Sequence, residues 1–174
     1  MNKLKEVKVR LNLPYVGGVE GTWQPDESEK NAAWELYIEL ITRISIAELK
    51  PDEGLLREAL TSLYNLFGIT RDILRKYGSS IARPKNDGYI SFGYLAVAIL
   101  NAVLRPMLSK WHPLLLDYEA NKPASLSSFE YEKQWDKNEA LRKELNRVRI
   151  ILSQYADILA EVADVPSLIV ERLK

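Results

Sequence analysis

The feature of this sequence that most constrains its fold is a seven-residue apolar repeat near the C-terminal end. Apolar side chains recur there in alternating steps of four and three residues: Leu141, Leu145, Val148, Leu152, Tyr155, Leu159 and Val162. This spacing places them on one stripe of a helix, here called the seam, which must pack against other helices. The seam predicts an all-α (mainly) protein with a long helix over 128–163, opened by the capping box Ser127-x-x-Glu130.

Three further helices are predicted upstream of the seam. Two lie within 26–77, and each follows a Pro-Asp-Glu tripeptide whose acidic residues suit the positive end of a helix dipole. A third, over 91–119, is apolar on most sides, which predicts a central position. Because Pro106 lacks a backbone N–H, we expect a kink within this helix. The stretch 167–173 is predicted to be a short tail.

The first 24 residues are predicted to form a small β-strand or hairpin. Apolar and polar residues alternate there with the period of a half-buried strand, the apolar set being Val7, Val9, Leu11 and Leu13. The Gly17-Gly18 pair could close a hairpin. Together these elements predict a four-helix bundle with a kinked central helix, a long C-terminal helix and a small N-terminal hairpin, in a single domain of residues 1–174.

Composition excludes several functional classes. Lysine and arginine number 24, as do aspartate and glutamate, so no overall field draws the chain to nucleic acid or to anionic membranes. The sequence has no cysteine and one histidine, so we expect neither a metal site nor another cofactor. The sequence also lacks the glycine-rich motifs of the Rossmann turn and the Walker loop, which bind nucleotide phosphates. Because no apolar run is long enough to span a bilayer, we expect a cytoplasmic protein that does not contact membranes.

One polar arrangement stands out on the helix predicted over 91–119. Asn101, Arg105 and His112 fall within about 40° of one another around a continuous helix, so an amide, a guanidinium and an imidazole share one face. Such a set could bind phosphate and transfer a proton. The Arg105-x6-His112 spacing on a late helix resembles the HEPN superfamily, whose nuclease members cleave RNA without metal, in paired subunits, through an Arg-x(4 to 6)-His motif.

The HEPN resemblance implies catalytic roles for this set. His112 would act as general acid or base on the RNA 2′-hydroxyl, and Arg105 would stabilise charge on the scissile phosphate, with Asn101 beside them. Pro106 departs from the family pattern, which usually has a polar residue directly after the arginine. The alternative is structural: Arg105 pairs near the helix kink, and His112 satisfies a local hydrogen bond.

The leading functional hypothesis from the sequence is a non-catalytic interaction or accessory protein that assembles with itself or with another protein. The seam could pack onto such a partner or form the inner edge of this chain. The candidate interface residues are Leu141, Leu145, Val148, Leu152, Tyr155, Leu159 and Trp135. The alternative is a HEPN-like ribonuclease or an inactive RNA-binding relative. A third hypothesis is a small-ligand sensor with a pocket lined by Trp34, Tyr37 and Tyr94.

Overall fold

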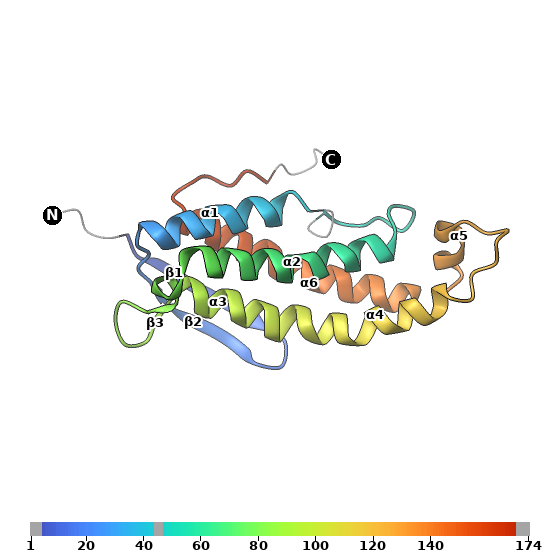
Figure 1. Ribbon diagram of the computed structural model, residues 1–174, viewed down its shortest axis with the longest axis horizontal. Coiled ribbons are helices and arrows are strands. Elements are labelled where there is room, and N and C mark those ends of the chain that lie inside the picture. The colour runs from blue at the N-terminus through green and yellow to red at the C-terminus, as the bar shows by residue number, and fades with distance from the viewer. Residues whose placement is uncertain (1–4, 44–46, 170–174) are drawn as a thin grey trace.

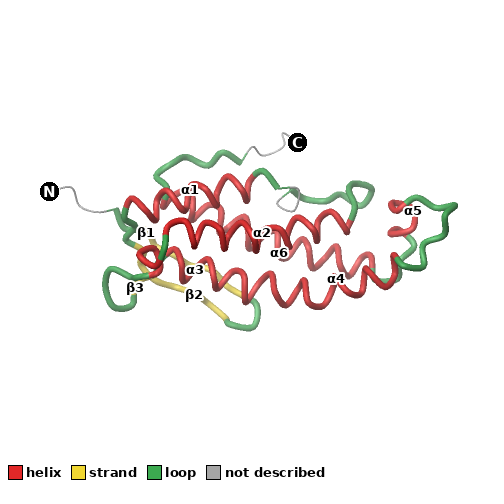
Figure 2. Tube along the Cα trace, in the orientation of Figure 1, coloured by secondary structure: helices red, strands yellow, loops and turns green. Residues whose placement is uncertain are grey.

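A computed structural model describes residues 5–43 and 47–169, and this part of the chain is mainly helical, as predicted (Figure 1). Long helices run side by side, and the strands gather at the end where α3 begins (Figure 2). The elements in chain order are β1 (Val7–Leu13), β2 (Gly17–Trp23), α1 (Glu27–Ile41), α2 (Leu56–Tyr77), the 3₁₀ helix η2 (Ser79–Ala82), β3 (Tyr89–Ile90), α3 (Phe92–Ile99), the π-helical turn η3 (Leu100–Leu104), α4 (Arg105–Glu119), α5 (Ser128–Lys133) and α6 (Asn138–Val162).

The sheet is a β1–β2 hairpin with a third short strand beside it. β1 pairs antiparallel with β2, and β3 pairs parallel with β2. The alternation in β1 buries Val7, Val9, Leu11 and Leu13 and exposes the residues between them. Gly17 already pairs with Leu13, so the turn consists of residues 14–16, before the glycine pair rather than at it. The sequence did not predict β3, because two residues show no periodicity.

α3, η3 and α4 form one continuous apolar helix from Phe92 to Glu119. Where a kink was predicted, the backbone makes a π turn, in which the N–H of Arg105 donates to the carbonyl of Leu100, five residues earlier. The turn accommodates Pro106, which has no N–H to donate. By length and composition this helix could cross a membrane. However, 61% of its most apolar window is buried inside the protein, as in the core helix of a soluble protein.

The single long helix predicted over 128–163 is instead two helices. α5 and α6 are separated by residues 134–137, and the predicted capping box opens α5. Trp135, in the break, is buried; it packs edge-on against Trp111 with ring centroids 6.3 Å apart and stacks on Tyr118 at 5.5 Å. Because these contacts hold Trp135 against α4, the chain turns there instead of continuing as a helix.

The seam is buried in the core of this chain. Its side chains belong to one hydrophobic cluster with those of the sheet and the other helices: Leu141, Leu145, Val148, Leu152, Tyr155, Leu159 and Val162. α6 packs against α1, α2 and β1. The seam and Trp135 therefore form the inner edge of the fold and offer no surface to a partner in this structure. Residues 163–169 are not helical, and 170–173 of the predicted tail lie outside the described residues.

Candidate functional site

A pocket of about 570 Å³ lies between α2 and α4. This volume is within the range of small-molecule sites, roughly 300–1,000 Å³. Arg105 and His112, which the sequence places on one helix face, both line it. The complete lining is Tyr64, Asn65, Phe67, Gly68 and Arg71 from α2, and Arg105, Leu108, Ser109, His112 and Pro113 from α4.

The opposite directions of α2 and α4 arrange this lining in pairs (Figure 1). The ring of Tyr64 stacks on the ring of His112, with centroids 6.0 Å apart and planes 22° apart. Two helical turns forward along α2 and two turns back along α4 lead to Arg71 and Arg105. The pocket thus has an aromatic end, formed by Tyr64 and His112, and a cationic end, formed by Arg71 and Arg105. The two ends lie roughly 10 Å apart, at 1.5 Å of helix rise per residue.

Gly68 lies midway between the two ends on α2. A Cβ atom added at this glycine would meet no atom within 4 Å, so packing does not require glycine there. A glycine in a helix interior also destabilises the helix by about 0.5–1 kcal/mol relative to alanine. What Gly68 does provide is open space in the middle of the pocket.

The cationic end carries positive charge that no described carboxylate neutralises. Neither of its arginines takes part in an ion pair within residues 5–43 and 47–169. Arg71 lies over the ring of Phe67 at 5.5 Å, and Nε of Arg105 donates to Oδ1 of Asn101 at 3.2 Å. The lining contains no aspartate or glutamate. Although the whole chain has no net charge, the lining of this pocket contains two arginines and no acid, a charge distribution that attracts anions.

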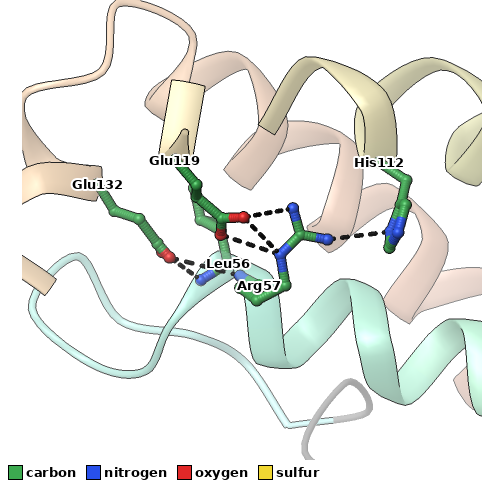
Figure 3. A network of polar contacts seen from close by, with 5 residues as sticks. All are labelled: Leu56, Arg57, His112, Glu119 and Glu132. Atoms are coloured by element: carbon green, nitrogen blue, oxygen red, sulfur yellow. Dashed lines mark hydrogen bonds and ion pairs between the residues drawn. The ribbon is translucent and has the colours of Figure 1, made fainter. Parts of the chain in front are cut away.

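At the aromatic end, an arginine from the first turn of α2 holds His112 (Figure 3). Nη1 of Arg57 lies 3.0 Å from Nδ1 of His112, and Nε and Nη2 of Arg57 donate to Glu119 at 2.8–3.1 Å. Because a guanidinium can only donate, Nδ1 of His112 must accept. The neutral ring therefore carries its proton on Nε2.

Glu132, on α5, holds the start of α2 and with it Arg57. The N-cap residue Leu55 has no side chain that could accept a hydrogen bond from the helix. Instead, the carboxylate of Glu132 accepts from the backbone N–H groups of Leu56 at 2.8 Å and Arg57 at 3.4 Å (Figure 3). Burial raises the pKa of Glu132 above its ordinary value, and the two hydrogen bonds partly oppose this rise. Glu132 thus caps α2 from a distant part of the chain.

The remaining predicted site residues lie elsewhere. Asn101 accepts a hydrogen bond from Arg105, but it lines a separate apolar groove at the hairpin tip. Trp34 lines a groove between α1 and α2 and contacts Tyr37, with ring centroids 6.1 Å apart. Tyr37 is fully buried, whereas Tyr94 is 56% exposed on α3, and neither lines that groove. The structure therefore does not gather these three aromatic residues around one pocket.

Sequence reasoning missed the α2 half of the pocket. Tyr64 is 61% exposed on α2, and the sequence predicted no site role for it, for Gly68 or for Arg71. One signal was present in the sequence. Gly68 interrupts a strongly helical stretch, and an isolated glycine in such a place often has a packing or functional reason.

Metal binding has no support from the described residues, where no group of three or more His, Cys, Asp or Glu side chains could hold an ion. Comparisons with protein-family models, curated proteins and solved structures find no match to this chain. The function is therefore inferred from the geometry of the pocket.

Proposed function

We propose that this chain is a non-catalytic binding protein whose α2–α4 pocket holds the phosphate group of an anionic ligand. The observation that carries the proposal is the pair Arg71 and Arg105 at one end of the pocket, neither with an acidic partner in the described part of the chain. Guanidinium groups match phosphate oxygens in both charge and geometry. The lining contains no acid that would compete with a phosphate for them.

The hydrogen bonding of His112 supports binding rather than general-base catalysis. Nδ1 accepts from Arg57, so Nε2 carries the ring proton and can donate to a ligand oxygen. A general base would need a free lone pair on Nε2 and hence a proton on Nδ1. That proton would face a second donor, Arg57, and the contact would be lost. In this proposal His112 is a hydrogen-bond donor to the ligand.

Calorimetric titration with ribose 5-phosphate and with pyrophosphate tests the phosphate site. We expect binding to the wild type, and a loss of about ten-fold or more in affinity for Arg71→Ala or Arg105→Ala, because each removes a charge-assisted hydrogen bond. Arg75→Ala is the matched control, since Arg75 lies one turn further along α2, pairs with Asp72 and does not line the pocket. No binding by the wild type, or an equal loss in the control, would overturn the proposal.

A second candidate function, a HEPN-like metal-independent ribonuclease, is favoured by one observation: Arg105 and His112 line the same pocket. The discriminating experiment incubates single-stranded RNA, in the presence of a chelator, with the wild type and with His112→Ala. Cleavage by the wild type that is lost in the variant, and that requires the 2′-hydroxyl, would favour the nuclease. If neither protein cleaves the RNA, the nuclease is excluded and only the binding proposal remains.

Association with itself or with another protein is a further part of the proposal. The seam is internal, so a partner would need another surface. The tip of the hairpin offers one, because Tyr15 is 85% and Val16 64% exposed, and Tyr15 has a positive φ of 65°. Its test is the mass in solution of the wild type and of Tyr15→Ser.

Two further expectations belong to the proposal. The first is that α1, α2, the Phe92–Glu119 helix and α6 form a four-helix bundle, and the second is that the protein is cytoplasmic.

A further inference from the structure

We infer that the ligand of the α2–α4 pocket is a nucleotide, with its base stacked on Tyr64 and its phosphate between Arg71 and Arg105. This inference rests on the proposed phosphate site and adds the chemistry of the rest of the ligand. The argument comes from the order of groups along the pocket: an aromatic end, an uncharged middle with both polar and apolar side chains, and a cationic end.

The aromatic end is a stacking platform held in place before any ligand arrives. Tyr64 is 61% exposed, although it lies on a helix whose other large apolar residues are mostly buried. His112 stacks against the ring on one side, and Arg57 and Glu119 hold His112 in turn. His112 covers one face of the Tyr64 ring, and the exposed remainder of the side chain is available to a flat ligand. A purine or pyrimidine presents such a face, and bases stack on aromatic side chains with little dependence on sequence.

The middle of the pocket suits a sugar. Gly68 leaves it open on the α2 side, where an added Cβ would meet no atom. The lining between the two ends is uncharged. Asn65 and Ser109 offer an amide and a hydroxyl that can donate and accept hydrogen bonds with sugar hydroxyls, and Phe67 and Leu108 offer apolar surface to the sugar carbons.

The length of the pocket matches the order of groups in a nucleotide. From Tyr64 to Arg71 the helix rises roughly 10 Å, so the ring and the charge of the ligand must be separated by a spacer. In a nucleoside 5′-phosphate the sugar is that spacer. Inorganic phosphate would leave the aromatic end empty, and an anionic lipid would place its apolar chains against Asn65 and Ser109. The nucleotide is the ligand class that uses all three parts of the lining.

Titration with three probes tests the inference and separates it from the proposed function. The probes are adenosine 5′-monophosphate, ribose 5-phosphate, which lacks the base, and adenosine, which lacks the phosphate. We expect the wild type to bind the nucleotide about five- to a hundred-fold more tightly than ribose 5-phosphate, the range that stacking of one base supplies. Tyr64→Ala should abolish this ratio and leave the affinity for ribose 5-phosphate unchanged, whereas Tyr64→Phe should preserve it.

Each other outcome has a defined meaning. If ribose 5-phosphate and the nucleotide bind the wild type equally, the base is not recognised and the inference fails, while the phosphate site stands. If neither binds, the proposed function fails with it. Filling the middle of the pocket by Gly68→Leu should weaken all three probes, and it provides a second readout if Tyr64→Ala unfolds. A 5′-phosphorylated trinucleotide of RNA that binds more tightly than the mononucleotide would assign the site to the end of an RNA strand; equal affinity would assign it to the free mononucleotide.

Discussion

Nη1 of Arg57 lies 3.0 Å from Nδ1 of His112, and the same guanidinium forms a two-pronged ion pair with Glu119. The two partners of Arg57 lie seven residues apart on α4, which is about two helical turns. The first turn of α2 is therefore joined to the second half of α4 by one side chain. The geometry makes Arg57 a positioning residue, since it acts on the pocket through the orientation and proton position of His112.

The tautomer of His112 should depend on Arg57. In the wild type we expect imidazole ¹⁵N chemical shifts of a ring protonated at Nε2, because Nδ1 accepts from the guanidinium. In Arg57→Ala the ring loses this donor, and the two tautomers should become mixed. The chain has a single histidine, so the signals need no assignment. Shifts identical in Arg57→Ala and in the wild type would show that the contact does not set the tautomer.

Removing the distant cap of α2 should destabilise the protein. Glu132→Ala takes away the acceptor of two backbone N–H groups, and we expect the free energy of unfolding to fall by about 1–3 kcal/mol. Glu130→Ala is the matched control, because Glu130 lies on the same helix and belongs only to the exposed capping box with Ser127. Urea denaturation measures both. An equal loss in the two variants would contradict the capping role of Glu132.

The two buried glutamates should give the unfolding free energy a measurable pH dependence. Burial raises the pKa of Glu29 and of Glu132 above the ordinary value of 4.5, although each accepts backbone hydrogen bonds that oppose the rise. The folded state therefore holds these protons to higher pH than the unfolded state. The stability that this supplies is full below pH 4.5 and is lost as the pH rises through the raised folded pKa values.

The prediction is that the free energy of unfolding changes differently with pH in two proteins. As the pH rises from 4.5, the wild type should lose stability relative to the double variant Glu29→Gln, Glu132→Gln, which cannot titrate at these positions. The lowered pKa of an exposed acid such as Asp164, which pairs with Lys5, acts alike in both proteins and cancels in the difference. Urea unfolding at steps of pH measures it. A wild type that gains stability relative to the variant over this range would have the wrong sign.

The parts of the fold that sequence alone predicted are those fixed by local chemistry. The alternation from Val7 to Leu13 became a strand with the expected face buried, and the capping box at Ser127 begins a helix. The second helix predicted within 26–77 ends at Tyr77, where Gly78, with φ of 72°, follows it as glycine often does at a helix C-terminus. In each case the neighbouring residues are enough to decide the structure.

The parts that sequence alone did not predict depend on contacts between distant segments. The helical pattern continues through residues 134–137, but Trp135 packs there against Trp111 and Tyr118, and the helix is interrupted. The pocket also depends on contacts between distant segments. His112 could be singled out as the sole histidine, but its stacking partner Tyr64 is found only once the directions of α2 and α4 are known. No spacing along the chain indicates that pairing.

The hydroxyl of Tyr155 should destabilise the folded state. It is buried and has no hydrogen-bond partner among the described atoms, and burial raises the pKa of this phenol well above its ordinary value. We expect Tyr155→Phe to raise the free energy of unfolding by about 1 kcal/mol, because an unpaired buried polar group is removed. Tyr37→Phe is the control with the opposite sign, since the Tyr37 hydroxyl accepts from the backbone N–H of Leu168 at 2.6 Å. Destabilisation by Tyr155→Phe would indicate a partner for that hydroxyl.

Gly68 allows stability and binding to be separated at one position. Gly68→Ala should stabilise the protein by about 0.5–1 kcal/mol, because alanine loses less backbone entropy in a helix interior and its Cβ has free space. Ligand affinity should hardly change, since a methyl group fills little of a pocket of about 570 Å³. Gly68→Phe should keep the gain in helix propensity only in part and should fill the middle of the pocket.

Thermal unfolding and titration of the same two variants measure the separation. A more stable Gly68→Ala that still binds ribose 5-phosphate, beside a folded Gly68→Phe that does not, is the expected pair of results. It would show that the space above Gly68 is occupied by ligand, because helix stability alone favours alanine at this position. If Gly68→Phe binds as tightly as the wild type, the ligand does not enter between α2 and α4, and the site must lie elsewhere.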